Sequence, residues 1–233
     1  MDRKRVEEWY WYNYCESFIN ELEFVEETYY TKIDKIYDDP DIEADRYMNY
    51  LENNIDKVKA QCIEDVEPEI LSMSYSRYNL IKNMKYRNLI VYISLVYEMF
   101  EQFLLSKVKN QLLLSQDKKY TTSIDIKYLE QIKNVFLKYN LDFDKIEEYK
   151  KINELRLLNN VIKHGNGDSK EKLLKIRPDI FNNSNGLDKS NLYNQTIISD
   201  NLNITNNDFK EYVDNIKKFL KKIPPKLSYD YYI

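Results

Sequence analysis

The stretch NLIVYISLVYEMFEQFLLS, residues 88–106, is the most apolar segment of the chain and decides its fold class. Its apolar side chains recur every three or four residues, which is the period of an α-helix with one buried face. The recurring positions are Leu89, Ile90, Ile93, Val96, Tyr97, Phe100 and Leu104. Glu98 and Glu101 also lie in the stretch, and each acid would cost roughly 2.5–3.5 kcal/mol at the centre of a bilayer. We therefore expect a core helix and not a membrane span.

Turn-forming residues are scarce throughout the chain. Only 3 glycines and 5 prolines occur in 233 residues, whereas 43% of the residues are hydrophobic. Folds built from strands need many turns, so this composition predicts long helices with few connections. The N-terminal segment MDRKRVEEWYWY lacks the apolar run of a signal peptide, and the two cysteines match no metal-binding spacing. We expect a cytoplasmic all-α protein that needs no metal or other cofactor and does not contact a membrane.

Helical periodicity continues on both sides of the core helix. The expected helices cover residues 2–38, 41–65, 69–114, 125–139, 145–164 and 206–222. The third is either one very long helix or two helices broken near 82–86, and polar loops are expected at 116–123 and 182–200. The predicted fold is an antiparallel helical bundle with an N-terminal long-helix extension. Its two parts are an acidic N-terminal helical hairpin (1–67) and a helical core (68–233) that includes the loop 182–200 and the C-terminal helix.

Local signals mark the end of the fifth helix and the start of a short helix after it. Gly165 is expected to end the helix over 145–164 as a left-handed C-cap. Asp168 is expected to cap the next helix, with Glu171 three residues later in the manner of a capping box. Pro178 then sets the limit of that short helix.

Charge is distributed unevenly along the chain. Residues 1–66 contain 8 Lys/Arg and 18 Asp/Glu, a net charge of −10, although the whole chain has a net charge of only −4. Residues 150–179, in contrast, contain 8 basic and 4 acidic side chains. The basic region predicts a surface where phosphates can dock. The acidic helices predict a docking surface for a cognate protein partner, or a mask over the basic region.

The only histidine of the chain lies in NELRLLNNVIKHGNGDS, residues 153–169. At about 100° per residue, the helix carries aliphatic residues on one side and a polar stripe on the other. The stripe consists of Arg156, Asn159, Asn160, Lys163 and His164. Imidazole can give or take a proton near neutral pH, and a guanidinium group fits the oxygens of a phosphate. This combination is typical of RNA cleavage by attack of a 2′-hydroxyl on its own phosphodiester.

The spacing of the two key residues predicts a second subunit. Arg156 and His164 are eight positions apart, about 12 Å along a helix axis. One scissile phosphate cannot easily contact both side chains of one helix. Two such helices packed across a twofold axis could bring the arginine of one subunit near the histidine of the other. We therefore expect a homodimer.

The same segment, R156-L-L-N-N-V-I-K-H164, resembles the signature of the HEPN superfamily, compact α-helical domains found in toxin–antitoxin and antiviral (antiphage) defence systems. Seven residues separate Arg156 and His164, one more than that signature usually has. The resemblance covers about residues 70–222, and LR…N…KHG…RPxxF is also similar to a pattern of uncharacterised bacterial proteins. It implies a metal-independent endoribonuclease acting on RNA, with Arg156, His164 and Asn160 as catalytic residues. Glu98 or Glu101 would then support the arginine, and Asn159, Lys163 and Arg177 would bind substrate.

Two other functions fit the sequence. Some HEPN-like domains are non-catalytic scaffolds that bind a protein partner or nucleic acid, and the acidic helices would then carry the main interaction. Nucleotide or small-molecule binding in a helical cleft is the third hypothesis. No P-loop, dinucleotide-binding or nucleophile-elbow motif occurs in the chain.

Overall fold

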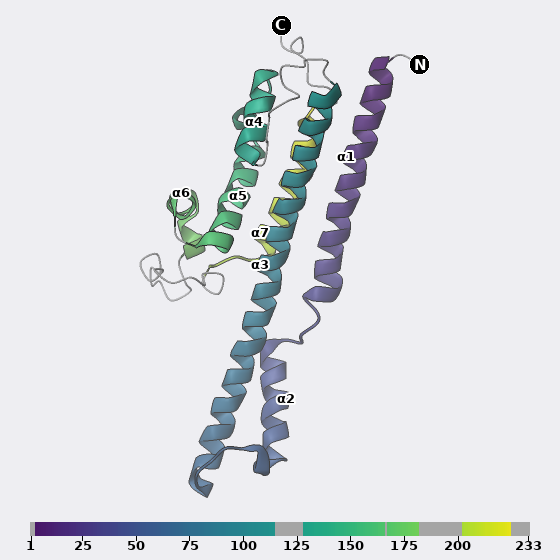
Figure 1. Cartoon of the computed structure of the whole chain (residues 1–233). Helices are drawn as coiled ribbons and strands as arrows, with labels where there is room; N and C mark the ends of the chain where they lie inside the picture. Colours follow the sequence, from purple (N-terminus) through teal and green to yellow (C-terminus); the bar gives the residue numbers. More distant parts are fainter. Residues whose placement is uncertain (1–2, 115–127, 166, 182–201, 225–233) are drawn as a thin grey trace. The chain divides into compact units, whose positions relative to one another are not determined.

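The computed structural model describes residues 3–114, 128–165, 167–181 and 202–224, and within these ranges the regular secondary structure is entirely helical (Figure 1). The α-helices are α1 (Arg3–Thr28), α2 (Pro40–Glu52), α3 (Val66–Leu114), α4 (Leu129–Lys138), α5 (Tyr149–His164), α6 (Asp168–Ile176) and α7 (Asn206–Lys222). A π-helical segment (Tyr29–Ile33) and 3₁₀ turns (Ile55–Lys57, Ile63–Asp65, Phe143–Lys145, Pro178–Phe181) lie between them. The predicted all-α class is confirmed.

The chain forms two compact units, and their limits differ from the predicted 1–67 and 68–233. The larger unit contains residues 1–27 and 92–233, and the smaller unit contains residues 28–91. The first helix groups with the C-terminal helices because its aromatic side chains are buried there. Trp11 Nε1 donates to the Ile223 carbonyl at 3.0 Å, and the Phe18 ring stacks on Phe103. The predicted division followed the charge composition of the chain, and charge composition does not show which aromatic side chains are buried together.

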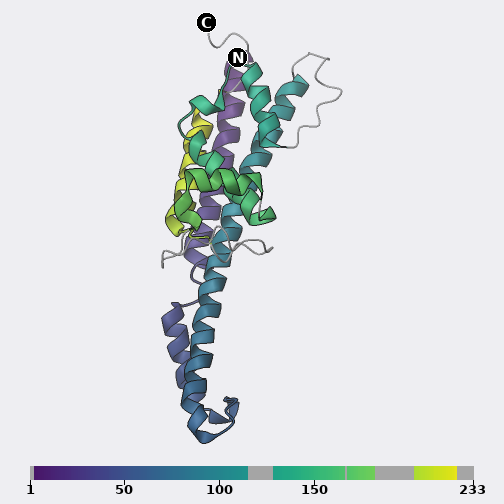
Figure 2. The same cartoon turned by 90° about the vertical axis from the view of Figure 1, so that its left-hand side faces the viewer.

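An aromatic cluster forms the centre of the larger unit. The Phe219 ring of α7 packs edge-on against Phe100 of α3 and against Phe143, with ring centroids 5.7 and 5.0 Å apart. Tyr149, at the start of α5, packs against the same Phe219 ring. The fully buried positions of the core stretch, among them Ile93, are on the face of α3 that enters this unit. Turning the molecule in Figure 2 shows α6 lying crosswise to α5.

The smaller unit is a hairpin of α2 and the first part of α3. Asp39 caps α2 by accepting from Asp41 N–H at 3.0 Å, and Pro40 occupies the first helical position. Glu43 pairs with Arg77 at 3.4 Å, and Lys85 Nζ donates to the Tyr37 carbonyl at 3.2 Å. Residue numbers increase from Tyr37 to Glu43, whereas those of their partners decrease from Lys85 to Arg77. The two helices therefore run antiparallel.

Helix boundaries match the predictions best near the C-terminus. The helix expected over 206–222 is α7 with the same limits, and the short helix ends before Pro178 as expected. The stretch 69–114 is one helix without a break near 82–86; it already begins at Val66, since a proline such as Pro68 is tolerated in a first turn. By length and composition alone, part of α3 could cross a membrane, and half of that stretch is buried.

Other predicted limits need correction. The helix expected over 2–38 leaves α geometry at Thr28, and the one expected over 41–65 ends at Glu52 and is followed by two 3₁₀ turns. The helix 145–164 begins at Tyr149 after a separate 3₁₀ turn, and the part of the helix 125–139 that is described begins at Leu129. The predicted loops 116–123 and 182–200 lie outside the described residues.

The junction between α5 and α6 was predicted only in part. Gly165 ends α5 with a positive φ of 70°, and its N–H donates to the Val161 carbonyl at 2.8 Å. The predicted capping role of Asp168 is wrong. Gly167 occupies the N-cap position, Asp168 is the first residue of the helix, and no side chain caps the helix. An acid in this first turn still interacts favourably with the positive end of the helix dipole.

Candidate functional site

Helix α5 is buried on more than one side and is open to solvent mainly at its C-terminal end. Ile152, Leu155, Leu158 and Val161 are fully or almost fully buried, as expected from their spacing of three residues. On the other side, Lys163 and His164 are exposed at the C-terminal end of the helix. Packing of the aliphatic face therefore fixes the orientation of the predicted catalytic side chains.

His164 is the last residue of α5. Its ring is exposed, and it makes no hydrogen bond to any other residue that the structure describes. Lys163, next to it, pairs with Glu98 of α3 at 2.5 Å, and these side chains are 42% and 48% exposed. The imidazole can thus be reached from solvent beside a cation whose present partner is weakly bound, because exposed ion pairs contribute only about 0–1 kcal/mol.

Arg156 lies two turns before His164 on the same helix, and its side chain is only 17% exposed. Its Nε and Nη2 donate to Asn153 Oδ1 at 3.1 and 2.9 Å, and Nη2 lies 3.6 Å from Glu130 Oε1 of α4. A planar guanidinium held at two nitrogens has a fixed orientation. Asn153 and Glu130 therefore orient the Arg156 guanidinium, which is largely buried.

The acid next to Arg156 is Glu130, whereas the family resemblance implied Glu98 or Glu101. Glu98 pairs with Lys163. Glu101 accepts from the Tyr97 hydroxyl and from Leu129 N–H, both at 3.0 Å, so that it caps the start of α4. Burial, and then the neighbouring Glu101 carboxylate, raises the pKa of Tyr97 well above its usual range, so this hydroxyl stays a donor.

The structure does not bring Arg156 and His164 of one chain together. Helix α5 is continuous from Tyr149 to His164, so the backbones of the two residues remain about 12 Å apart along its axis. Between them, Asn160 is half-buried and its Nδ2 donates to Ser169 Oγ of α6 at 3.3 Å. This amide therefore contributes to the packing of α6 on α5.

Asn159, a predicted substrate-binding residue, does not lie on the open face. It is buried, and its Oδ1 has no hydrogen-bond partner among the described residues. On the helix it falls between Ile152 and Leu155, both of which face the core. The predicted polar stripe was therefore too wide, and Asn159 belongs to the interior.

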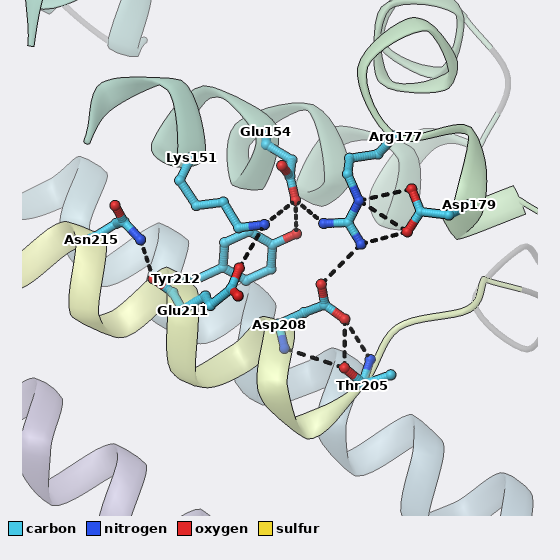
Figure 3. A network of polar contacts seen from close by, with 9 residues as sticks. All are labelled: Lys151, Glu154, Arg177, Asp179, Thr205, Asp208, Glu211, Tyr212 and Asn215. Atoms are coloured by element: carbon cyan, nitrogen blue, oxygen red, sulfur yellow. Dashed lines mark hydrogen bonds and ion pairs between the residues drawn. The ribbon is translucent and has the colours of Figure 1, made fainter. Parts of the chain in front are cut away.

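Arg177, the other distant candidate for substrate binding, is held by three carboxylates (Figure 3). Its guanidinium lies 2.6 Å from Glu154, 2.8 Å from Asp179 and 3.0 Å from Asp208. Hydrogen bonding to Asp179 is the main reason that its pKa is raised, against the effect of burial. In the structure, the donors that were expected to bind a phosphate bind acids of the same chain.

Glu154, which was not among the residues predicted from the sequence, is the buried centre of this network. One of its oxygens, Oε1, accepts from Arg177 Nη1 at 2.6 Å, from Lys151 Nζ at 2.9 Å and from the Tyr212 hydroxyl at 2.8 Å (Figure 3). The sequence does contain a sign of its burial, because on a helical wheel Glu154 falls between the aliphatic residues Leu158 and Val161. A carboxylate in an aliphatic face requires buried partners.

Two exposed lysines lie on α6, the helix that follows α5. Lys172 and Lys175 of α6 are exposed, close in sequence to His164. No group of three His, Cys, Asp or Glu side chains that could hold a metal ion occurs in the described part of the chain. No protein-family model, curated protein or solved structure matches this chain.

Proposed function

We propose that this protein is a HEPN-like endoribonuclease that cleaves RNA without a metal ion and acts as a homodimer. The observation that carries the proposal is the exposed imidazole of His164 at the end of a packed helix, beside Lys163 and on the same helix as the oriented Arg156. A proton-transfer group, a phosphate-binding cation and a fixed guanidinium are the parts that metal-free RNA cleavage requires.

The reaction would be an internal transfer within RNA. His164 accepts the proton of a 2′-hydroxyl group, and the oxygen of that group attacks the adjacent phosphorus. The 5′-oxygen then leaves and takes up a proton from an acid. The products are a 2′,3′-cyclic phosphate and a 5′-hydroxyl. Solvent water can supply that proton, so one His164 and one Arg156 complete each site.

Arg156 would stabilise the negative charge that develops on the phosphorus centre. Because it lies about 12 Å from His164 of its own chain, the arginine of one subunit serves the histidine of the other. Asn153 and Glu130 keep the guanidinium oriented before RNA binds, so that little reorganisation is needed during the reaction.

Lys163 would hold a flanking phosphate. Its exposed pair with Glu98 contributes little stability, so an RNA phosphate can replace that carboxylate. We expect the exposed Lys172 and Lys175 of α6 to bind further phosphates, which predicts binding that weakens as the salt concentration rises.

The direct test is cleavage of a random-sequence RNA pool and of total RNA by the purified chain in the presence of a metal chelator. We expect fragments ending in 2′,3′-cyclic phosphate, and no cleavage of the same pool carrying 2′-O-methyl groups. His164→Ala and Arg156→Ala should each lower the rate by a factor of about 10² to 10⁴. Lys210→Ala, at an exposed cation on α7 that has no part in the proposed site, serves as the matched control and should leave the rate unchanged.

Wild-type protein that leaves both RNA samples intact, or activity that is the same in His164→Ala, would contradict the nuclease. Retained RNA binding without cleavage would instead favour a non-catalytic scaffold built on the same surface. Thermal melting of each variant by circular dichroism separates a lost function from a lost fold.

A further inference from the structure

The tip of the α2–α3 hairpin, residues 52–75, exposes an unusual number of large apolar side chains. Ile63 is 90% exposed and Tyr75 is 67% exposed, and Ile55 and Leu71 are also exposed. Single exposed apolar residues are ordinary on a protein surface, but a group within one short segment marks an interaction site. We propose that the hairpin tip binds a partner protein through a segment that carries large apolar side chains together with Lys and Arg.

These side chains do not contribute to the core of the smaller unit. Its buried apolar positions on α3 are Ile70, Ile81, Leu89 and Ile90, and Leu51 of α2 is buried completely. Leu71 follows Ile70 directly, which turns it by about 100° away from the buried face. The core of the hairpin therefore does not need the exposed residues. Their burial by a partner would contribute favourable free energy to binding, because apolar surface would be removed from water.

Part of the surface is a regular strip along α3. Leu71, Tyr75 and Tyr78 follow one another at intervals of four and three residues, so they line one side of the helix over about 10 Å. The rings of Tyr75 and Tyr78 are stacked, with centroids 6.3 Å apart and an angle of 8° between their planes. Rigid tyrosine surfaces of this kind are enriched in the centres of protein interfaces.

The charge of the hairpin tip selects the kind of partner. Residues 52–75 contain six acids and two lysines, and five of the acids are exposed: Glu52, Asp56, Glu64, Asp65 and Glu67. An acidic rim around apolar residues repels RNA and anionic membranes. It is complementary to a cationic protein segment, since charge complementarity speeds association and suppresses wrong partners.

The order of side chains on α3 also indicates a binding mode. Glu67 precedes Leu71 by one helical turn, and Lys82 follows Tyr78 by four residues, with its ammonium group 5.7 Å from the Tyr78 ring centre. The strip is thus acidic at the hairpin end and basic at the other end. An amphipathic helix fits it best, with its apolar face on the strip and its Lys and Arg next to Glu67.

This inference is independent of the nuclease proposal, because the hairpin tip has the opposite charge to a surface that binds RNA. The test selects peptides from a displayed random library on the full-length chain, and counter-selects on Leu71→Ser/Tyr75→Ser. We expect the enriched peptides to combine a net positive charge with at least two large apolar residues. Their affinity, measured by fluorescence anisotropy, should fall at least tenfold for that variant and several-fold for Glu64→Gln/Glu67→Gln.

Leu137→Ser, at an exposed apolar position of α4, is the matched control and should bind the peptides as the wild type does. The proposal is overturned if no peptide distinguishes wild type from Leu71→Ser/Tyr75→Ser, or if the enriched peptides are neutral or acidic. It is also overturned if that variant abolishes self-association of the chain in sedimentation, because the occupant is then a second copy. Equal circular dichroism melting curves confirm that the variants fold.

Discussion

Glu154 and Arg177 connect three segments of the larger unit through one buried carboxylate oxygen. Glu154 is on α5, Arg177 follows α6, and the Tyr212 hydroxyl that donates to the same oxygen is on α7. Desolvating charges is costly, and their mutual attraction offsets that cost only when hydrogen bonding is complete. Here the acid has three donors, so removing any one of them leaves buried charge without a full set of partners.

Replacing Arg177 with alanine is expected to lower the free energy of unfolding by about 3 kcal/mol, in the range observed when one partner of a buried pair is removed. Arg46→Ala is the control, because Arg46 of α2 pairs with Asp38 at the exposed surface and such pairs contribute little to stability. Urea denaturation followed by circular dichroism measures both values. Equal effects of the two substitutions would show that the buried network does not stabilise the unit.

Acidification should weaken the same network through Asp208. Burial raises the pKa of this carboxyl, but hydrogen bonds from Thr205 and Arg177 outweigh burial and hold the pKa below its usual value. The unfolded chain then binds more protons than the folded chain, so stability is present above about pH 4 and is lost as the pH falls through the lowered pKa. Denaturation midpoints between pH 3 and 6 should therefore depend less on pH in Asp208→Asn. A slope equal to that of the wild type would contradict this assignment.

Single residues were predicted from the sequence with mixed success, for identifiable physical reasons. The exposure of His164 and Lys163 followed from the helical period of one aliphatic face. The burial of Asn159 did not follow, since α5 packs on more than one side. Arg177 was expected to bind substrate because sequence shows its charge but not the carboxylates that meet it from α5 and α7.

At the scale of elements, α3 and α7 form the frame on which α5 is placed. Phe219 of α7 contacts aromatic rings from α3, from α5 and from the 3₁₀ turn before α5. Helices of this size gain most of their stability from such packing and not from intrinsic propensity. The position of α5 therefore depends on one aromatic cluster.

Truncation of Phe219 to alanine is expected to destabilise the protein by about 3–5 kcal/mol, because the removed ring leaves a cavity in a closely packed interior. Phe24→Ala removes the same ring from a position on α1 that is 66% exposed and should cost less than about 0.5 kcal/mol. Thermal melting compares the two variants. Similar melting temperatures would mean that the aromatic cluster does not hold the helices together.

The sequence predicted helices best where capping and periodicity agree. The limits of α7 were predicted correctly because Thr205 and Asp208 form a capping box before an amphipathic stretch. The helix after Pro40 was predicted too long, since the residues after Glu52 carry no strong stop signal, yet leave the helix for 3₁₀ turns. Tertiary packing, which periodicity does not contain, sets such ends.

On the scale of the whole molecule, the chain separates into a unit that carries the histidine helix and a hairpin with an acidic tip. The grouping of α1 with the larger unit could not be predicted from charge, because it depends on the burial of Trp11 and Phe18 against partners far away in sequence. Each unit has its own proposed interaction: RNA at the end of α5, and a cationic protein segment at the hairpin tip.

The central claim is that one RNA-cleaving site takes Arg156 from one subunit and His164 from another. The most direct measurement is RNA cleavage by Arg156→Ala and His164→Ala chains, each alone and after co-expression. Each variant alone should be inactive. Random pairing gives one intact site in half of the dimers, so the mixture should recover about a quarter of wild-type activity. A mixture that stays as inactive as its components would contradict the shared site.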